Sequence, residues 1–408
     1  MRIAYLTQPY PPMVSGASAV AEHLAKEMAT RGHEVLVIAA SERDHGYTQT
    51  EGNLTVMRLR SIKNPLRVGQ KILLFPRNKV LKALSDFQPD VIHAHEPIQM
   101  GSLGLEFANQ ARIPITMTTH QLPWFVSSYL PDKFGIRKIV ETLLWRYAGR
   151  LTKKFSAIIS PTQTISRIIK RKIGIKPKTI SYGINLKIFH PHPTAEEEFE
   201  TCAKFGLPLN KPVILHTGRL DADKSVKRVI LATAPVLCEC DAHLVVAGDG
   251  NQKQSLEELC RLLGIESRVR FTGFISNKKE LAKIYRTSDL FITASEIETQ
   301  GIAILEAAAS GLPIAAVRAT CIPEIVQHGY NGYLTNPGDI SAMSKSIRKI
   351  LSDPAKTSEM KMKSRSIAEK FKSEITFTKH EKLYKQMISQ KSRQTFASRK
   401  PAKNPLYV

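Results

Sequence analysis

The strongest constraint on the fold is a set of short apolar runs that alternate with helical patterns and that occurs twice along the chain. Val35–Ala40 is an unbroken apolar run rich in β-branched residues, the pattern of a parallel strand buried on both faces. Strands of this kind, some of them more polar, are predicted at Ile3–Thr7, Val35–Ala40, Val91–His95 and Ile113–Thr119, and again at Val213–Thr217, His243–Ala247, Val269–Gly273, Leu290–Ala294 and Ile314–Val317. Helical periodicity between them predicts a doubly wound α/β domain in each half.

A stretch from Tyr182 to Pro193 separates the two sets, because it contains prolines and lacks apolar periodicity. The chain of 408 residues is long enough for two domains of ordinary size. We therefore predict domains at 1–185 and 186–375, and a terminal segment at 376–408 that is basic, polar and disordered after about Gln390. Parallel sheets bind ligands beyond the carboxyl ends of their strands, so a crevice between the two halves is the expected site.

Composition, apolar run length and cysteine spacing limit the classes of protein to which the chain can belong. Hydrophobic residues make up 42% of the chain and charged residues 23%, which is ordinary for a globular protein. No apolar run approaches the length of a membrane-spanning helix, and the N-terminal residues resemble neither a secretory signal nor a transit peptide. Five widely spaced cysteines indicate reduced intracellular thiols rather than a disulfide framework. We therefore expect a cytoplasmic protein.

The charge of the chain points to an anionic partner. Lysine and arginine total 59 against 36 acidic residues, a formal net charge of +23. Of these bases, 26 lie in three stretches that contain no acidic residue: Gly52–Ser85, Thr142–Ala195 and Lys382–Val408. Candidate partners are nucleic acid, anionic lipid headgroups and a phosphorylated substrate. For any single stretch, a solvated basic face is the alternative.

Common catalytic and cofactor motifs are absent from the sequence. It contains no GxxxxGK[ST] loop, HExxH, GxSxG or CxxC, and no GxGxxG follows the first strand, which argues against a nicotinamide dehydrogenase. Cys238, Cys240 and Cys260 lack a fourth ligand at zinc spacing. Nothing in the sequence therefore requires a metal.

The most informative segment runs from Ser295 to Pro313. Glu298 is predicted in the loop after a strand, and Gly301 at the start of a helix that carries Glu306. Backbone amides of Gly301 and Ile302 would form an anion site at the helix N-terminus, and the two carboxylates could accept hydrogen bonds from hydroxyl groups of one ligand. The alternative is a solvated acidic loop followed by an ordinary helix glutamate.

Two basic residues and several glycines also follow predicted strands. Arg219 and Lys224, after the strand at Val213–Thr217, are placed to neutralise a diphosphate, because arginine supplies a fork of donors and lysine a point charge. Glycine turns at Val245–Gly250 and Phe271–Phe274 would let main chain approach a planar base or a phosphate closely. Taken alone, each of these features is weak, and the two bases could be ordinary surface charges.

These motifs occur in a fixed order: GR(x4)K, AGDG, FTGF, and E(x7)E followed by AAASGLP. Over roughly Met1 to Gln390, this order resembles glycosyltransferase family 4, the retaining GT-B enzymes. The resemblance implies an α/β GT-B fold in which two Rossmann-like domains face each other across a cleft. It also implies a nucleotide-sugar donor held mainly by the C-terminal domain, an acceptor bound by the N-terminal domain, and a C-terminal helix that returns toward the N-terminal domain.

The family's roles can be carried over by position. They fall on Arg219 and Lys224 for the donor diphosphate, on Gly301 and Ile302 for backbone amides beside it, on Glu306 for the ribose hydroxyls, and on Glu298 for the donor sugar or its departure. Gly16 corresponds to the glycine loop of the N-terminal domain, where the family often has two glycines and this chain has Ala17 next. His120, at a strand end, matches the family's cleft histidine near the sugar. The alternative is a histidine satisfied within its own loop.

A finer resemblance concerns the acceptor. Pro12–Gly16 and Glu298–Gly301 resemble enzymes that glucosylate diacylglycerol at the membrane surface, and two of the acid-free stretches lie in the N-terminal half. Four apolar residues after His120 are candidates for an acceptor wall or for interfacial anchors, or else pack under a loop: Trp124, Phe125, Tyr129 and Leu130.

A basic amphipathic helix is also predicted in the N-terminal half. Its isoleucines are Ile165, Ile168, Ile169 and Ile173, and its bases are Arg167, Lys170, Arg171 and Lys172. The favoured interpretation is that the isoleucines pack on the sheet and that only the bases are exposed.

The resemblance implies a retaining hexosyltransferase that moves glucose from UDP-glucose, and with the charge of the chain it predicts diacylglycerol or a glycolipid as the acceptor. It would act as a peripheral protein on the cytoplasmic face of the cell membrane, with an anionic membrane surface as partner. The alternatives are a mannosyl- or hexosyltransferase acting on phosphatidylinositol or a soluble sugar, and a GT-B epimerase or phosphorylase. A nucleic-acid-binding protein is suggested by the charge alone, and the tandem α/β pattern opposes it.

Overall fold

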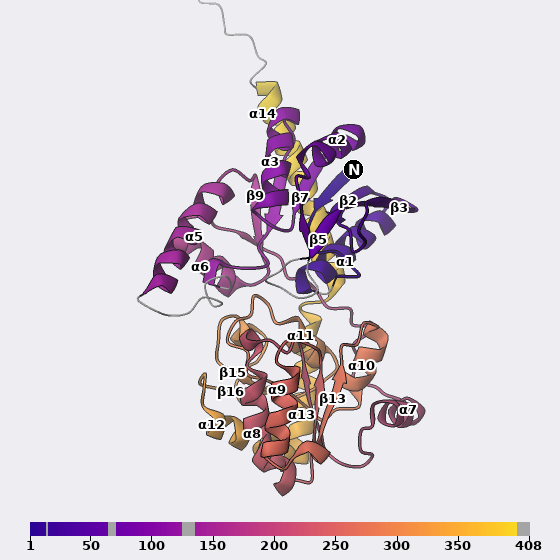
Figure 1. The fold of residues 1–408 in the computed structure, drawn as a ribbon, viewed down its shortest axis with the longest axis vertical. Helices are drawn as coiled ribbons and strands as arrows, with labels where there is room; N and C mark the ends of the chain where they lie inside the picture. The colour runs from indigo at the N-terminus through magenta and orange to yellow at the C-terminus, as the bar shows by residue number, and fades with distance from the viewer. Residues whose placement is uncertain (14, 64–70, 125–134, 398–408) are drawn as a thin grey trace, which may run out of the picture. The chain divides into compact units, whose positions relative to one another are not determined.

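The structure, a computed structural model, describes residues 1–397 apart from Val14, 64–70 and 125–134 (Figure 1). The chain divides into two compact units. Unit 1 comprises Met1–Pro161, Ser166–Ile180 and the chain from Thr376 onward, and unit 2 comprises Thr162–Ile165 and Ser181–Ile375.

Unit 1 is built on a sheet that contains, among the described residues, eight strands in the order β10-β9-β8-β7-β1-β2-β4-β3. The strands are β1 (Arg2–Leu6), β2 (Glu34–Ala40), β3 (Tyr47–Glu51), β4 (Leu54–Leu59), β7 (Val91–Ala94), β8 (Ile115–Thr118), β9 (Ala157–Ser160) and β10 (Lys178–Thr179). Neighbouring strands are parallel except β3 and β4, which are antiparallel. A separate antiparallel pair is formed by β5 (Ser61–Lys63) and β6 (Lys71–Leu73).

One face of this sheet is covered by α2 (Arg77–Phe87) and α3 (Gln99–Ala111). Leu84 of α2 and Leu105 of α3 are buried in a core that includes Ile92 of β7. This face of the central strands is therefore removed from water, as their continuous apolar sequences predict.

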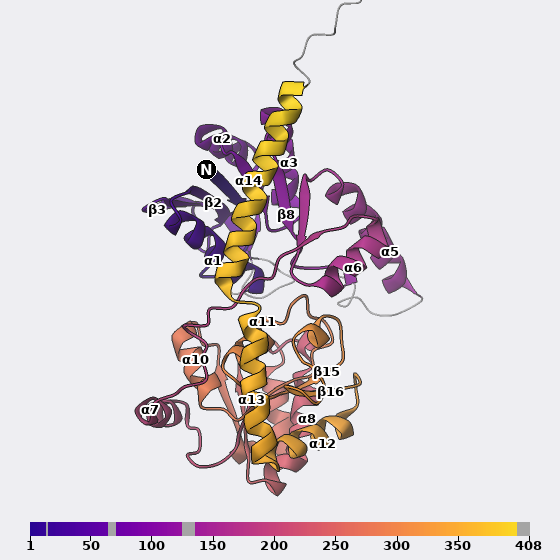
Figure 2. The same ribbon diagram turned by 180° about the vertical axis from the view of Figure 1, so that it is seen from behind.

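The other face is covered by α1 (Gly16–Thr30) and α14 (Ser373–Ala397), which lies along the sheet in Figure 2. Leu24 of α1 and Tyr384 of α14 are buried in a second core with Val37 of β2. The C-terminal helix is thus an integral layer of unit 1, although most of this unit comes from the N-terminal half of the chain.

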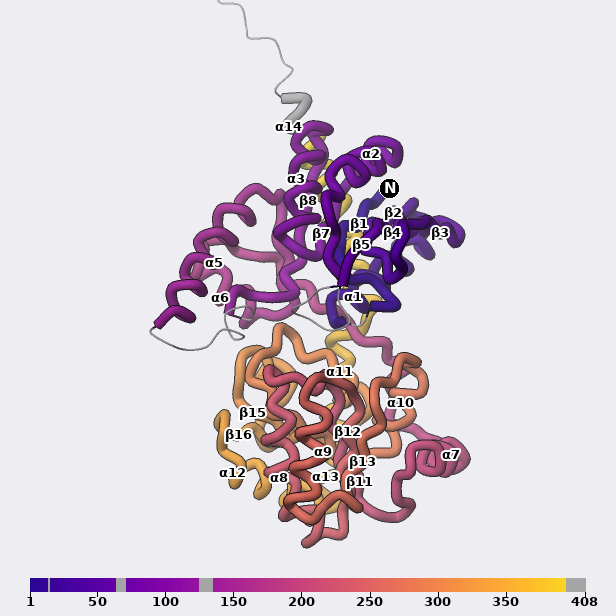
Figure 3. Tube along the Cα trace, viewed as in Figure 1, coloured from indigo at the N-terminus to yellow at the C-terminus, as the bar shows by residue number. Residues whose placement is uncertain are grey.

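At one edge of unit 1, α5 (Ile136–Thr152) packs against α6 (Gln163–Ile173), as the trace in Figure 3 shows. A Cβ atom added to Gly149 of α5 would lie 3.0 Å from Cγ2 of Ile173, so the two helices meet closely there. Ile165 and Ile169 of α6 are buried, Ile168 and Ile173 are half-buried, and its four bases are exposed, as the favoured interpretation expects.

Unit 2 contains, within the described chain, a parallel sheet of six strands in the order β13-β12-β11-β14-β15-β16. Its strands are β11 (Val213–Thr217), β12 (His243–Ala247), β13 (Val269–Gly273), β14 (Leu290–Thr293), β15 (Ile314–Val317) and β16 (Gly332–Thr335). Its helices are α7 (Ala195–Phe205), α8 (Val226–Glu239), α9 (Lys253–Leu262), α10 (Lys278–Arg286), α11 (Ile302–Ala309), α12 (Ile340–Leu351) and α13 (Pro354–Glu369). One continuous apolar core connects the sheet with these helices.

The predicted strands all occur, and four of those in unit 2 have the predicted bounds. The sequence analysis missed seven of the described strands: β3, β4, β5, β6, β9, β10 and β16. Helix α14 continues to Ala397, past Gln390, where a disordered tail was expected to begin. Its apolar residues up to Ile388 pack in the core of unit 1. Residues 398–408 of that tail lie outside the described residues.

Within the described part of the chain, no helix is both long and apolar enough to cross a membrane. All five cysteines are free.

Candidate active site

Unit 2 brings the predicted donor-binding residues to the carboxyl edge of its sheet. β11 ends at Thr217 and is followed by Arg219 and Lys224, and β14 ends at Thr293 and is followed by Glu298. β11 and β14 are parallel neighbours, so the loops that follow them emerge at the same edge. This is the edge at which open α/β sheets bind their ligands.

Lys224 and Glu298 form an ion pair at this edge, with Nζ 2.5 Å from Oε1. Their side chains are 19% and 18% exposed, so the pair is shielded from water but remains reachable. The main chain of Glu298 is also fixed: its N–H donates to Oγ1 of Thr320 at 3.3 Å, and its carbonyl oxygen lies 3.3 Å from Sγ of Cys321. The arrangement holds a cation and a carboxylate side by side, as a ligand with anionic and hydroxyl groups requires.

Arg219 is more exposed than Lys224 and is already engaged by carboxylates. Its guanidinium donates to Asp221 and, at 2.8 Å, to Oδ2 of Asp223, whose side chain is buried. Two guanidinium nitrogens are used in these contacts. A diphosphate at this edge would therefore share Arg219 with two aspartates, a competition that the sequence alone did not reveal.

The glycines of the AGDG turn let two loops meet main chain to main chain. Gly218 donates its N–H to the carbonyl oxygen of Ala247 at 3.1 Å. A Cβ atom at Gly248 would lie 1.8 Å from the carbonyl oxygen of Gly218, and one at Gly250 would lie 2.6 Å from the carbonyl carbon of Leu220. These glycines therefore make room for the neighbouring loop, whereas the sequence analysis assigned that room to a base or a phosphate.

A Gly248→Ala substitution is expected to lower the free energy of unfolding of unit 2 by about 3 kcal/mol, because neither rigid main chain can yield 1 Å or more without breaking the loop contact. Urea unfolding followed by far-UV circular dichroism measures the loss. Asn251→Ala, in the same turn and exposed, is the matched control, with an expected change below about 0.5 kcal/mol. Equal stability of the two variants would contradict the packing argument.

Helix α11 begins directly after Gly301, whose φ of 78° is in the left-handed region that glycine adopts without strain. The preceding residue, Gln300, is buried and accepts the N–H of Tyr182 at 2.6 Å through Oε1, which fixes the approach to the helix. The first amides of a helix, here those of Ile302 and its successors, have no partner within the helix and carry its positive dipole end. Gly301 and Ile302 thus lie at a helix start, where the sequence analysis expected one.

Glu306 is buried on α11 and is not the solvated helix glutamate of the alternative interpretation. The hydroxyl of Tyr285 donates to its Oε2 at 3.0 Å, and the same hydroxyl lies 2.5 Å from Oγ1 of Thr217 at the end of β11. Burial raises the pKa of the Glu306 carboxyl. Tyr285 was missed by sequence reasoning because it lies on α10, 21 residues before Glu306.

His216 is a second residue that the sequence analysis missed. It is buried in β11, with Nδ1 2.9 Å from the carbonyl oxygen of Ile292, so Nδ1 donates and Nε2 is left as an acceptor. Nε2 has no hydrogen-bond partner among the described residues, and a Cβ atom at Gly218 would lie 3.7 Å from it. Burial, with the nearby charge of Lys224, lowers the pKa of His216 to about 4. Its position two residues before Gly218 is the one local signal that could have found it.

In unit 1, His120 follows β8 and belongs to a stack of imidazoles. Its Nε2 lies 2.9 Å from Nδ1 of His95, which follows the neighbouring strand β7, and their rings stack with centroids 5.1 Å apart. Burial, reinforced by His380, lowers the pKa of His120 to about 3. His120 is therefore a neutral imidazole near pH 7 and can accept or donate a hydrogen bond without carrying charge.

The stack continues into the interior of unit 1. His93 lies 4.4 Å from His95, ring centroid to centroid, and its Nδ1 and Nε2 lie 2.7 Å from the hydroxyls of Tyr384 and Thr118. Its pKa is lowered by burial and by the neighbouring histidines. The C-terminal helix, through Tyr384, thus helps to hold the strand end that carries His120.

The structure describes only some of the remaining predicted residues of unit 1. Gly16 is exposed at the first position of α1, after Ser15, whose Oγ caps the helix by accepting the N–H of Ser18 at 3.0 Å. Trp124 is half-buried, with its ring centroid 5.9 Å from that of Trp145. Phe125, Tyr129, Leu130 and Val14 lie outside the described residues.

Comparison with known proteins gives matches to both halves of the chain. The model of the family "Glycosyltransferase Family 4" matches residues 14–187, and that of "Glycosyl transferases group 1" matches residues 197–368. The alpha-monoglucosyldiacylglycerol synthase of Streptococcus pneumoniae is 30% identical over 82% of this chain and 73% of its own length. The sulfoquinovosyl transferase of Arabidopsis thaliana is 29% identical over 86% of this chain and 67% of its own.

Among solved structures, an Anabaena protein in complex with UDP-glucose superimposes with a TM-score of 0.72 at 22% identity, covering 97% of this chain and all of that one. The likeness extends over both units, each with the Rossmann-like sheet described above. The order of motifs, the parallel sheets and these matches lead to one conclusion: the chain belongs to glycosyltransferase family 4 and is a hexosyltransferase of the GT-B fold.

Proposed function

We propose that the protein is a retaining glucosyltransferase that moves glucose from UDP-glucose to a membrane lipid, diacylglycerol or a glycolipid. The donor part of this proposal, UDP-glucose, rests on the ion pair of Lys224 and Glu298 beside the start of α11. The acceptor half is supported by the relatives whose names specify glucosyldiacylglycerol and sulfoquinovosyl transfer.

In this proposal, residues 186–375 bind the donor. Lys224 and Arg219, with the amides of Gly301 and Ile302, stabilise the negative charge that develops on the departing diphosphate. Glu306, held by Tyr285, accepts hydrogen bonds from the ribose hydroxyls.

The transfer step is proposed to occur on one face of the sugar. Glu298 contacts the donor sugar, and neutral His120 contacts it from unit 1, while Gly16 opens the helix that follows the N-terminal loop. The acceptor hydroxyl attacks from the face that the diphosphate leaves, its proton passes to the departing phosphate, and the anomeric configuration is retained.

Residues 1–185 and the helix within 376–408 are proposed to bind the acceptor at an anionic membrane surface, on the cytoplasmic face. The support is the concentration of acid-free basic stretches in this part of the chain. The second candidate acceptor is phosphatidylinositol, which a mannosyltransferase 26% identical to this chain has in its name.

The test is an acceptor panel. UDP-glucose is supplied with mixed vesicles that contain diacylglycerol, monoglucosyldiacylglycerol or phosphatidylinositol, and separately with soluble sugars. We expect product with the first or second lipid, and an α-linkage in its NMR spectrum, because UDP-glucose is itself an α-glucoside. Product only with phosphatidylinositol or with soluble sugars would overturn the proposed acceptor, and a β-linkage would overturn retention.

A further inference from the structure

Helix α5 carries a stripe of large apolar side chains that face solvent. Ile136, Ile139, Leu143 and Tyr147 are 49%, 59%, 56% and 48% exposed. They are spaced three and four residues apart, which puts them on one face of the helix. Scattered exposed apolar residues are normal, but four on one helical face form a patch that requires an explanation.

The opposite face of α5 is the one that packs on the protein. Trp145 and Gly149 are buried, Gly149 lies against Ile173 of α6, and the side chain of Lys172 lies over the Trp145 ring with Nζ 5.9 Å from its centroid. The exposed stripe is therefore not the face with which α5 packs on the protein. It is a second apolar face, in addition to the face that already packs against α6.

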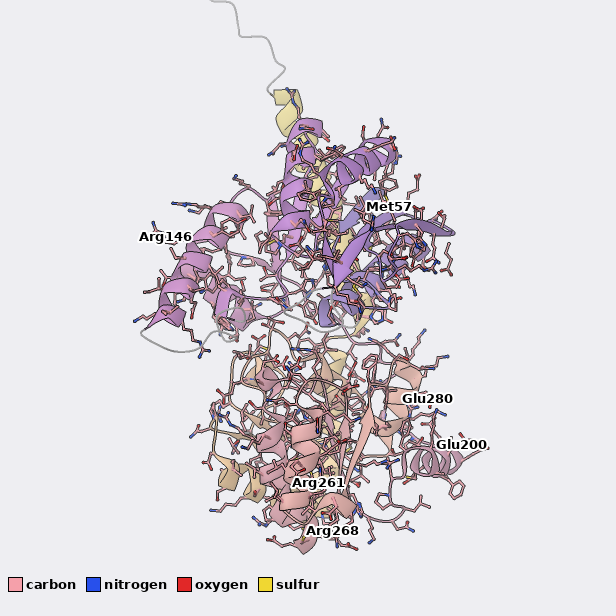
Figure 4. All side chains as sticks on the ribbon, viewed as in Figure 1. Met57, Arg146, Glu200, Arg261, Arg268 and Glu280 are labelled. Atoms are coloured by element: carbon pink, nitrogen blue, oxygen red, sulfur yellow. The ribbon has the colours of Figure 1, made fainter. Side chains whose placement is uncertain are left out.

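Positive charge lies beside the stripe. Arg146 and Arg150 are exposed on α5 itself, and Arg146 extends from its outer side in Figure 4. Lys153 and Lys154 follow at the end of α5 and are also exposed. The acidic residue of α5, Glu141, lies 4.0 Å from Lys172 of α6, on the packed side of the helix. An apolar strip with basic flanks is the pattern of a helix that lies in the headgroup region of an anionic bilayer.

We propose that the exposed face of α5 docks the protein on anionic lipid, with Ile136, Ile139, Leu143 and Tyr147 inserted among the acyl chains and the flanking bases on the headgroups. This inference rests on the proposed lipid acceptor and names the surface that would reach it. It places the membrane contact on α5 rather than on α6, whose Ile165 and Ile169 are buried.

Three pairs of substitutions separate the contribution of the apolar stripe to vesicle binding from that of the bases. Ile139→Ser with Leu143→Ser removes the apolar stripe without changing charge, and Arg146→Gln with Arg150→Gln removes bases without changing the stripe. The matched control is Leu262→Ser with Met362→Ser, two exposed apolar residues on helices of unit 2. Sedimentation with vesicles of phosphatidylcholine, with and without phosphatidylglycerol, measures binding, and circular dichroism checks that each variant is folded.

We expect the wild type and the unit 2 control to sediment with anionic vesicles and much less with neutral ones. The stripe variant should bind anionic vesicles at least tenfold more weakly. The arginine variant should bind more weakly at low salt and lose part of the salt dependence. Unchanged sedimentation of the stripe variant, or no vesicle binding by the wild type, would overturn the proposal. So would a stripe variant that changes only the oligomeric state, since a second copy of the chain would then cover the stripe.

Activity separates this inference from the proposed function. With a short-chain diacylglycerol kept below its micelle concentration, the folded stripe variant should transfer glucose as fast as the wild type, whereas with vesicles it should be at least tenfold slower. Loss of transfer by the wild type with both acceptors would refute the proposed acceptor, while the sedimentation result would still decide the docking surface.

Discussion

Lowering the pH from 7 to 5 is expected to destabilise unit 1 by about 4 kcal/mol or more, a large part of the stability of an ordinary domain. The cause is a cluster of four histidines, of which His93, His95 and His380 are buried and His120 is half-buried. Burial lowers the pKa of His120 to about 3 and that of His380 to about 4, and it lowers the pKa of the other two as well.

The sign follows from proton binding. As the pH falls below about 6.5 the unfolded chain protonates these histidines, whereas the lowered pKa values make the folded chain resist protonation, so stability falls as the pH falls. His120 and His380 each contribute about 2 kcal/mol between pH 7 and pH 5, and His93 and His95 act in the same direction. The raised pKa of buried Glu96 acts in the opposite sense, but it is one carboxyl against four imidazoles.

The measurement is tryptophan fluorescence during acid titration, because both tryptophans, Trp124 and Trp145, lie in unit 1. His380→Met should shift the midpoint about half a pH unit lower, since one fewer proton is taken up on unfolding. His45→Gln, at an exposed histidine, is the control and should leave the midpoint in place. A midpoint below pH 4 in the wild type, or equal midpoints in the two variants, would contradict the account.

Lys224→Ala and Glu298→Gln are each expected to lower kcat/KM by about 100-fold or more, with most of the loss in kcat. Lys224 is proposed to act on charge that develops only as the diphosphate leaves, and removal of one such stabilising group typically costs that much. Glu298→Gln keeps the shape of the side chain but removes the charge that holds Lys224 at 2.5 Å.

The chain supplies a matched control for these substitutions. Arg228 and Glu296 form another ion pair between the start of α8 and the loop after β14, with side chains 42% and 40% exposed. Glu296→Gln should change kcat/KM less than about threefold, because exposed ion pairs contribute little. Equal losses from Glu296→Gln and Glu298→Gln would show that the loop, rather than this ion pair, determines the rate.

Most strands of unit 2 could be predicted closely because they contain short apolar runs rich in β-branched residues, as at β12 and β15. β9 was missed because its apolar run is only Ala157, Ile158 and Ile159, and β4 because its burial alternates. Such elements depend on their neighbours in the sheet, which the local pattern does not reveal.

The residues of the candidate site could be predicted where they lie close in sequence to the end of a strand. Arg219, Lys224 and Glu298 follow strands directly, so the rule of strand ends locates them. Tyr285 and Tyr384 could not be found in this way, because they reach Glu306 and His93 only through packing between distant segments.

The two basic helices of unit 1 show the same limit of local sequence patterns. α5 and α6 both combine apolar residues with bases, and periodicity alone does not say which apolar face is covered. Tertiary packing buries Ile165 and Ile169 of α6 and leaves the stripe of α5 exposed.

The central claim is tested most directly by transfer of radiolabelled glucose from UDP-glucose to diacylglycerol in anionic mixed vesicles, with the wild type and Glu298→Gln measured side by side. The account predicts a labelled glycolipid from the wild type that is nearly lost with the variant. No product from a wild-type protein that binds UDP-glucose would contradict the acceptor, and no binding of UDP-glucose would contradict the donor.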